Sequence, residues 1–202
     1  MPVPKLILIT DSSRMEYERF FEAVEASLCG GIDAVLVREK QMDSAHLLVF
    51  CSRLRAMTMT HNALLIVHSQ ADVARAVGAD GVHVAAMDME EIPAMRKWLN
   101  HEGMTISASC HSTEELERAM HYGADFALLS PVFSTASHPQ ALPLGVNRFM
   151  KIARNAGLPV IALGGISLEN RKELAGFGVA VISAILDADD PELATHCLSG
   201  LN

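Results

Sequence analysis

Paired glycines after an apolar stretch indicate a phosphate site in the last third of the chain. Gly164 and Gly165 follow the run that starts at Val160, and about one helix later Ser183 follows a second apolar run. Backbone N–H groups that converge on one point bind a phosphate, and glycine lacks the Cβ that would keep the chain away from it. Ser183 can add a hydroxyl, and a helix that begins after it can add N–H groups. We therefore expect a small phosphorylated ligand here, with a simple tight turn as the alternative role of the glycines.

A pair of cationic residues follows the second apolar run of the chain. Arg38 and Lys40 flank Glu39. Side chains of an extended segment point alternately to two sides, so the two cations are expected on one side and Glu39 on the other. Two positive charges on the same side can bind a phosphate or a pyrophosphate. A solvated charge cluster at the end of a strand is the alternative.

The elements that must position these residues alternate between strand and helix. Strands that are apolar throughout are typical of a parallel sheet covered by helices, and eight β/α units favour a closed (β/α)8 TIM barrel over an open, doubly wound sheet. Residues 1–202 are expected to form one domain. The predicted strands are Lys5–Thr10, Ala34–Glu39, Leu64–His68, Gly81–Val84, Thr105–Ser109, Phe126–Pro131, Val160–Gly165 and Val179–Ala184. The predicted helices are Glu16–Cys29, Ser44–Met57, Ala71–Val77, Met89–Leu99, Thr113–His121, Asn147–Asn155, Leu168–Ala175 and Pro191–Leu198.

Composition limits the partners of the chain. A formal net charge of -8 and an aromatic content of 5% argue against binding to nucleic acid or to an anionic membrane. The chain has no apolar run of about 18 residues and no signal-peptide pattern, so a soluble, cytoplasmic protein is expected. A homo-oligomer is compatible with the sequence. The four cysteines lack metal-site spacing and are expected to be reduced, mostly core thiols: Cys29, Cys51, Cys110 and Cys197.

Several histidines are expected where a barrel places its chemistry, at the carboxyl ends of the strands. His68, His111 and His138 follow the third, fifth and sixth strands, and with Asp88 they form one alternative, a zinc set, although no HxH or HxxxH spacing supports it. His83 lies inside a strand and is expected to be a hydrogen-bonded interior residue. The remaining histidines are expected at the surface: His46, His61, His101, His121 and His196.

Short motifs in one order along nearly the whole chain resemble the thiamine phosphate synthase and TenI superfamily. They are Ile9-Thr10-Asp11, Arg38-Glu39-Lys40, Ala79-Asp80-Gly81-Val82-His83-Val84, Ser130-Pro131-Val132-Phe133, Pro143-Leu144-Gly145, Ala162-Leu163-Gly164-Gly165-Ile166 and Val181-Ile182-Ser183.

The resemblance implies a TIM barrel that binds a thiazole phosphate and, in a synthase, joins it to an aminopyrimidine pyrophosphate with release of pyrophosphate. Carried over by position, Gly165, Ile182 and Ser183 would bind the thiazole phosphate. Arg38, Lys40 and Thr135 would face the pyrophosphate. His68, Ser137 and His138 are further candidates for substrate binding. Asp88 would hold Mg²⁺ if the chain is a synthase.

The chain also departs from the synthase pattern. Leu36 stands where the family usually has Gln, and His68-Ser69-Gln70 stand where it has Asn-Asp-Arg. Of the carboxylate pair that holds Mg²⁺ in the family, Asp88 alone remains, and the Thr-x-Thr-Lys of the sixth loop has become Thr135-Ala136-Ser137-His138. Departure of pyrophosphate depends on neutralisation of its charge, so these changes predict a reduced synthase rate.

Two alternatives need no metal. A tautomerase of the TenI type would shift a proton on a thiazole carboxylate phosphate, and its implied histidine at the end of the sixth strand is replaced here by Pro131. His111 or His138 could serve instead as the acid and base, since imidazole transfers protons near neutral pH. His111 could also cap the helix that begins near Thr113. The third alternative is a barrel that binds thiamine precursors without converting them.

Overall fold

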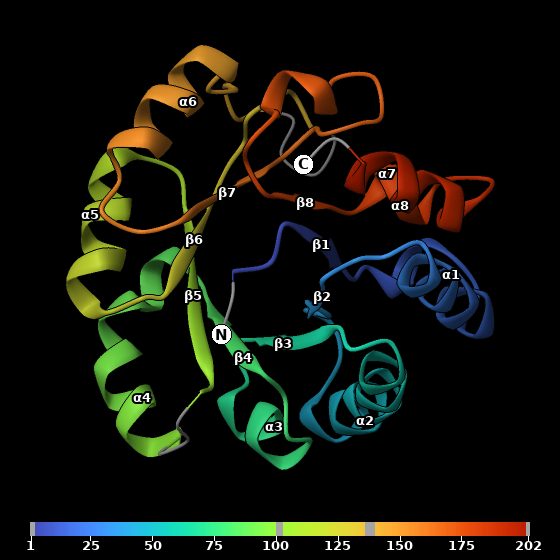
Figure 1. Ribbon diagram of the computed structural model, residues 1–202. Helices are drawn as coiled ribbons and strands as arrows, with labels where there is room; N and C mark the ends of the chain where they lie inside the picture. Colours follow the sequence, from blue (N-terminus) through green and yellow to red (C-terminus); the bar gives the residue numbers. More distant parts are fainter. Residues whose placement is uncertain (1–2, 100–102, 136–139, 201–202) are drawn as a thin grey trace.

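The strands form a closed parallel barrel, which confirms the predicted (β/α)8 fold. The computed structural model describes residues 3–99, 103–135 and 140–200. Each strand pairs with the next along the chain, and β8 pairs with β1 to close the ring, with the helices arranged around it (Figure 1). The strands are β1 (Leu6–Ile9), β2 (Ala34–Val37), β3 (Leu64–His68), β4 (Gly81–Val84), β5 (Thr105–Cys110), β6 (Phe126–Leu129), β7 (Val160–Leu163) and β8 (Val179–Val181).

Helices follow most of the strands and cover the outer face of the barrel. They are α1 (Tyr17–Cys29), α2 (Ser44–Thr60), α3 (Ala71–Ala76), α4 (Ile92–Leu99), α5 (Thr113–Tyr122), α6 (Val146–Asn155), α7 (Ser183–Leu186) and α8 (Pro191–Ser199). Three short 3₁₀ helices complete the set: η1 (Ser12–Arg14), η2 (Ala86–Glu91) and η3 (Arg171–Leu174).

Alternation along each strand divides the apolar residues into two layers. Leu6 and Leu8 of β1 point outward into the core between strands and helices, whereas Ile7 and Ile9 point into the barrel. Ile7 lies opposite Ala34 of β2 and Ala180 of β8 in the sheet register. The barrel interior is therefore a packed core rather than a channel, and any ligand must lie at its end. The inner layer consists of Ile7, Ile9, Ala34, Leu36, Ile66, Phe126, Leu128, Ile161 and Ala180.

The predicted helix Leu168–Ala175 is wrong, because this segment contains only η3 (Arg171–Leu174). Asn170 accepts a hydrogen bond from Ser167 N and donates one to the Gly165 carbonyl, and such side-chain bonds to the backbone compete with helix formation. The buried guanidinium of Arg171 donates to the carbonyl oxygens of Leu174, Phe177 and Leu198, and these bonds fix the turn in place of a longer helix.

Other boundaries also differ from the prediction. The segment that begins at Met89 is helical only from Ile92, because η2 precedes α4. Strand β8 ends at Val181, and the chain then turns into α7, a helix that the sequence analysis did not separate from the strand. Strands β2, β6 and β7 also end earlier than predicted, by two residues each, so the last two residues of each predicted strand lie in a loop.

The thiols only partly match the expectation of core residues. Cys51 and Cys110 are buried, and burial raises the pKa of each to about 12, so both thiols are protonated at neutral pH. Cys29 and Cys197 are exposed. All four are free, as expected.

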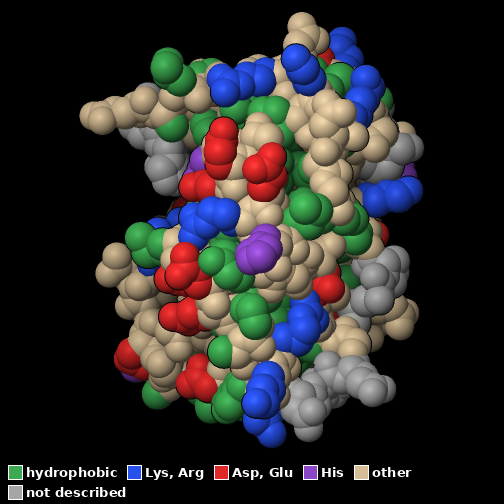
Figure 2. Space-filling model, turned by 90° about the vertical axis from the view of Figure 1, so that its left-hand side faces the viewer, with side chains coloured by type: hydrophobic (Ala, Val, Ile, Leu, Met, Phe, Trp, Pro, Cys, Tyr) green, Lys and Arg blue, Asp and Glu red, His purple; other side chains and the backbone are tan. Residues whose placement is uncertain are grey.

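The surface carries charges of both signs. On the face shown in Figure 2, acidic and basic side chains alternate with scattered hydrophobic ones, in keeping with the acidic net charge of the chain. Within the described residues, no helix is both long and apolar enough to cross a membrane.

Candidate active site

A cavity of about 320 Å³ opens at the carboxyl ends of the strands. This volume lies within the range of small-molecule sites. Apolar side chains such as Ile9, Leu36, Leu128 and Leu163 form part of its wall, and polar groups from loops of several strands complete it. Among the predicted site residues, those on the wall are Arg38, Lys40, His68, His111, Thr135, Gly164, Gly165, Ile182 and Ser183.

Gly164 and Gly165 have positive φ angles of 100° and 66°, and close packing explains why both must be glycine. A Cβ on Gly164 would lie 2.8 Å from Cα of Pro131, and one on Gly165 would overlap the carbonyl oxygen of Ser134. The loop after β6 therefore rests directly on this turn. The glycines make the turn possible and also expose its backbone to the cavity.

Ser183 is the first residue of α7, directly after Ile182. The first N–H groups of a helix have no partner within the helix, and here they lie beside the cavity wall. A helix thus begins at Ser183 itself, where the predicted strand Val179–Ala184 was expected to continue. Backbone N–H groups, the Ser183 hydroxyl and the glycine turn lie on neighbouring strands β7 and β8.

Arg14 is a cation on the cavity wall that the sequence analysis missed. Its guanidinium contacts Asp11 at 2.9 Å and Asp187 at 2.7 Å, which links the loop after β1 to the end of α7. The only sequence signal was its position shortly after the first strand, and the ion pair with Asp187 spans most of the chain. Arg14 thus brings to the cavity wall a guanidinium that is already paired with two carboxylates.

Arg38 and Lys40 both line the cavity, as the alternation of side chains predicted. Glu39 instead accepts hydrogen bonds from the backbone N and the hydroxyl of Ser12, the latter at 2.8 Å. The backbone N of Arg38 donates to the hydroxyl of Thr10 at 3.0 Å. These bonds tie the ends of β1 and β2 together and separate the acidic side chain from the two cations.

His83 is buried within the barrel beneath the cavity, with 2% of its surface exposed. Its Nδ1 contacts the hydroxyl of Ser107 and its Nε2 contacts that of Ser109, both at 2.8 Å. Burial lowers the pKa of His83 to about 3, with smaller contributions from His68 and Arg38. The predicted interior role is confirmed, and the two serine partners were not foreseen.

His68 lies close to His83, with ring centroids 5.7 Å apart. Burial, together with the charges of Arg38 and Lys40, lowers the pKa of His68 to about 4, so the ring is neutral at pH 7. Its Nδ1 is buried and has no hydrogen-bond partner among the described residues. A buried polar atom without a partner is costly, which makes this nitrogen a candidate contact for a bound ligand.

His111 lies at the cavity with its ring fixed by Ser130. Nδ1 is 3.0 Å from the carbonyl oxygen and 3.2 Å from the hydroxyl of Ser130; the carbonyl can only accept, so the tautomer that makes the shorter bond has its proton on Nδ1 and Nε2 as the basic nitrogen. Helix α5 is capped by Ser112, whose hydroxyl accepts from Glu115 N. The alternative in which the His111 side chain caps this helix is therefore wrong.

The remaining sequence predictions concern the other histidines and the loop after β6. Ser137 and His138 lie outside the described residues, as does His101. His46, His121 and His196 are exposed, but His61 is largely buried and contacts Glu25. The predicted zinc set is not found: within the part of the chain that the structure describes, His68, His111 and Asp88 do not come together as a group of possible ligands.

A known protein family matches almost the whole length of this chain. The family model described as thiamine monophosphate synthase matches residues 6–187, which include all eight strands and α7. The chain belongs to the thiamine monophosphate synthase/TenI family.

Proteins with similar sequences carry names that belong to the same family. The solved structure of a thiamine phosphate pyrophosphorylase from Pyrococcus furiosus is 35% identical, with a TM-score of 0.85 over 98% of this chain and 94% of that one. A thiamine-phosphate synthase from Ruminiclostridium cellulolyticum is 34% identical over 92% of this chain and 89% of its own length. One from Thermosynechococcus vestitus is 35% identical over 95% of this chain, which spans only 54% of that longer protein.

Thiamine monophosphate synthases generally use Mg²⁺, and the residues present allow a minimal site. Asp88 lies in η2 and acts electrostatically on His68, but it is not among the described residues that line the cavity. Mg²⁺ can be bound by a single carboxylate together with waters and substrate phosphates. Asp88 and a pyrophosphate would meet this requirement, whereas the described residues give no group of three possible ligands around Asp88.

We expect Gly165→Ala to lower the free energy of unfolding more than Gly176→Ala does. Both positions have positive φ, so each alanine costs about 1–2 kcal/mol. Only the Cβ at position 165 meets other atoms, because nothing lies within 4 Å at position 176. That overlap adds about 1–3 kcal/mol. Urea unfolding measures the difference, and equal losses in the two variants would contradict the packing described here.

Stability is expected to fall as the pH drops from 6.5 toward 4. The folded pKa of His68 lies below its ordinary value of 6.5, so the unfolded chain binds a proton before the folded chain does. A histidine whose pKa is lowered in this way changes the free energy of unfolding by up to about 1.4 kcal/mol per pH unit between these two pH values. His68→Asn should reduce the slope in urea unfolding, whereas His196→Asn, at an exposed position, should not. The same slope in all three proteins would show that His68 is not held neutral.

Proposed function

We propose that the chain is a thiamine-phosphate synthase that joins a thiazole phosphate to an aminopyrimidine pyrophosphate and releases pyrophosphate. One observation carries the proposal: a single cavity is lined both by the cations Arg38 and Lys40 and by the glycine turn with Ser183. Two anionic groups, one on each substrate, can thus be bound in one space. Family membership and the names of the relatives support the same reaction.

The two anion sites lie on different arcs of the ring. Arg38 and Lys40 follow β2, which β1 alone separates from β8, whereas the glycine turn follows β7, the next strand beyond β8. The thiazole phosphate would be bound by the Gly164–Gly165 turn and the start of α7, with Arg14 nearby. The pyrophosphate would face Arg38 and Lys40, with Asp88 beyond β4. Apolar side chains of the same cavity wall, including Leu36 and Leu128, can pack against the two rings.

The reaction forms a bond from the thiazole nitrogen to the methylene carbon of the pyrimidine, while the carbon–oxygen bond to pyrophosphate breaks. Negative charge then develops on the leaving group, and fixed cations around it lower the barrier. The backbone segment that carries Arg38 and Lys40 is positioned for this role by the bonds that join the ends of β1 and β2. Mg²⁺, when bound at Asp88, would neutralise part of the same charge. His68, which is neutral, can contribute a hydrogen bond but no charge.

The synthase reaction gives a direct test of this proposal. With both substrates and Mg²⁺, the protein should form thiamine phosphate, measured by chromatography. Arg38→Ala should lower kcat/KM by about 10²–10³-fold, the range seen when a group that stabilises developing charge is removed. Arg154→Ala, at an exposed position on α6, should leave it unchanged. Absence of product from the unmodified protein, or equal rates for the two variants, would refute the proposal.

His111 favours a second candidate activity, the tautomerisation of a thiazole carboxylate phosphate. The hydrogen bond from Nδ1 to Ser130 leaves Nε2 as a base at the cavity wall, where it could move a proton on a substrate bound by the glycine turn. If this reaction occurs, His111→Gln should slow it by about 10²–10⁴-fold while thiazole phosphate still binds. Isomerisation that is no faster than in buffer would exclude this activity for the chain.

A further inference from the structure

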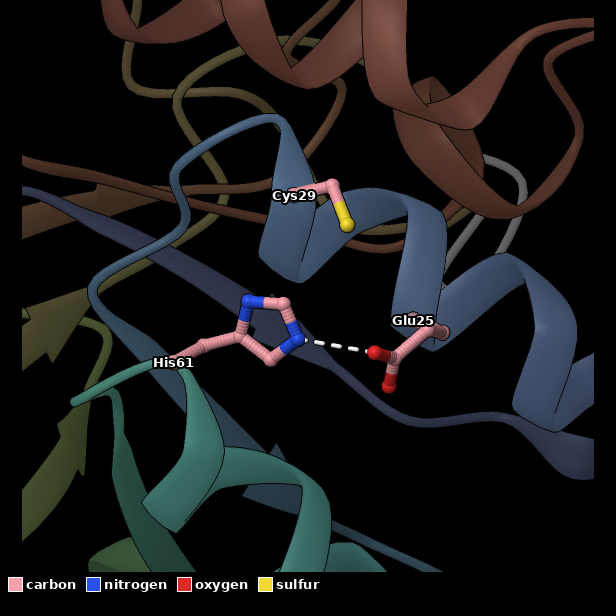
Figure 3. Close-up of side chains that lie close together, drawn as sticks. All are labelled: Glu25, Cys29 and His61. Carbon is pink, nitrogen blue, oxygen red and sulfur yellow. Dashed lines mark hydrogen bonds and ion pairs between the residues drawn. The ribbon is translucent and has the colours of Figure 1, made fainter.

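Three metal-ligating side chains meet at the end of the barrel opposite the cavity. Glu25 and Cys29 lie one turn apart on the same face of α1, and His61 follows the last residue of α2 (Figure 3). The carboxylate oxygen, Sγ and ring nitrogen lie within 4.8 Å of one another. Across residues 3–99, 103–135 and 140–200, this is the only group of three possible ligands found.

The location separates this cluster from the proposed active site. Helices α1 and α2 each return the chain to the amino end of the next strand, so their last residues lie away from the cavity. Cys29 is the last residue of α1, and His61 is the C-cap of α2. The carboxyl end of a helix carries partial negative charge, which favours a cation. Two such ends border the cluster.

The spacing of the three side chains is compatible with a tetrahedral ion. Zinc bonds of about 2.0–2.3 Å place neighbouring ligand atoms roughly 3.3–3.8 Å apart. Nε2 of His61 is now 2.8 Å from Oε1 of Glu25, so this pair would have to open slightly, and the sulfur lies within 4.8 Å of a ligand atom of each residue. The Glu25 side chain is 47% exposed and can make this adjustment by rotating. A fourth position would be left for water.

The helices that carry the ligands are held firmly against each other. The rings of Phe20 and Phe21 on α1 lie 5.4 and 5.2 Å from that of Phe50 on α2. Arg53 of α2 pairs with Glu18 of α1 and lies over the ring of Phe21. The backbone positions of the three ligands are therefore set before any ion binds, which reduces the entropic cost of binding.

We propose that Glu25, Cys29 and His61 bind a thiophilic divalent cation of the zinc class, joining α1 to α2. Thiolate and imidazole ligands favour zinc-like ions over Mg²⁺, which prefers oxygen. The cluster would therefore not compete for the Mg²⁺ of the proposed reaction. Loss of a proton from the thiol accompanies binding, so affinity rises with pH. The proposal does not depend on the activity assigned to the cavity.

Cobalt titration of the metal-stripped, reduced protein tests this directly, because Co²⁺ reports a thiolate ligand by an intense charge-transfer band. The unmodified protein should show the band, and Zn²⁺ but not excess Mg²⁺ should abolish it. Cys29→Ser should remove the band, whereas Cys197→Ser, which alters the other exposed thiol, should retain it. His61→Gln and Glu25→Gln should each weaken binding at least about tenfold.

A second readout is the effect of Zn²⁺ on thermal unfolding. An ion that binds only the folded state raises Tm, so Zn²⁺ should raise it for the unmodified protein and for Cys197→Ser, but not for Cys29→Ser. None of the described residues lining the cavity is a cysteine, so a thiolate band cannot arise from ions bound there. An absent band, or one that persists in Cys29→Ser, would overturn the proposal and leave Glu25 and His61 as a simple ion pair.

Discussion

The pairing of β8 with β1 is the constraint on which the rest of the structure depends. It joins Leu6 to Val179 and Leu8 to Val181, and so brings the first and last loops of the sheet to the same opening. The ion pair between Arg14 and Asp187 lies across this junction. Because all strands are parallel, closure gathers every carboxyl-terminal loop around one cavity, and groups far apart in sequence can bind one ligand pair.

The distribution of polar groups inside the barrel follows from the same closure. Most inward side chains are apolar and pack at the centre, but β4 and β5 contribute His83, Ser107 and Ser109, which satisfy one another below the cavity. Burial keeps His83 and His68 neutral, so the positive charge at the opening comes from the arginine and lysine side chains. Charge for binding anions is thus provided by arginine and lysine side chains, while the histidines offer hydrogen bonds.

Features with a local cause could be predicted from the sequence, and features that arise from tertiary contacts could not. Alternation of side chains, continued past the end of β2, gave the correct sides for Arg38, Glu39 and Lys40, and apolar runs placed all eight strands. The helix predicted at Leu168–Ala175 does not form, because hydrogen bonds of the Asn170 and Arg171 side chains fix a different backbone path. Arg14 and the two serines beside His83 carry no local signal, because their importance depends on partners from other strands. His61 was misplaced at the surface for the same reason, since Glu25 lies on a different helix.

The central claim is that one cavity binds two anions on different arcs of the ring. A crystal structure of the protein with thiazole phosphate and pyrophosphate tests it most directly. We predict that the monoester phosphate lies against the Gly164–Gly165 turn and Ser183, and that pyrophosphate lies against Arg38 and Lys40. A structure with both anions on the same cations, or with the glycine turn vacant under saturating ligand, would contradict the claim.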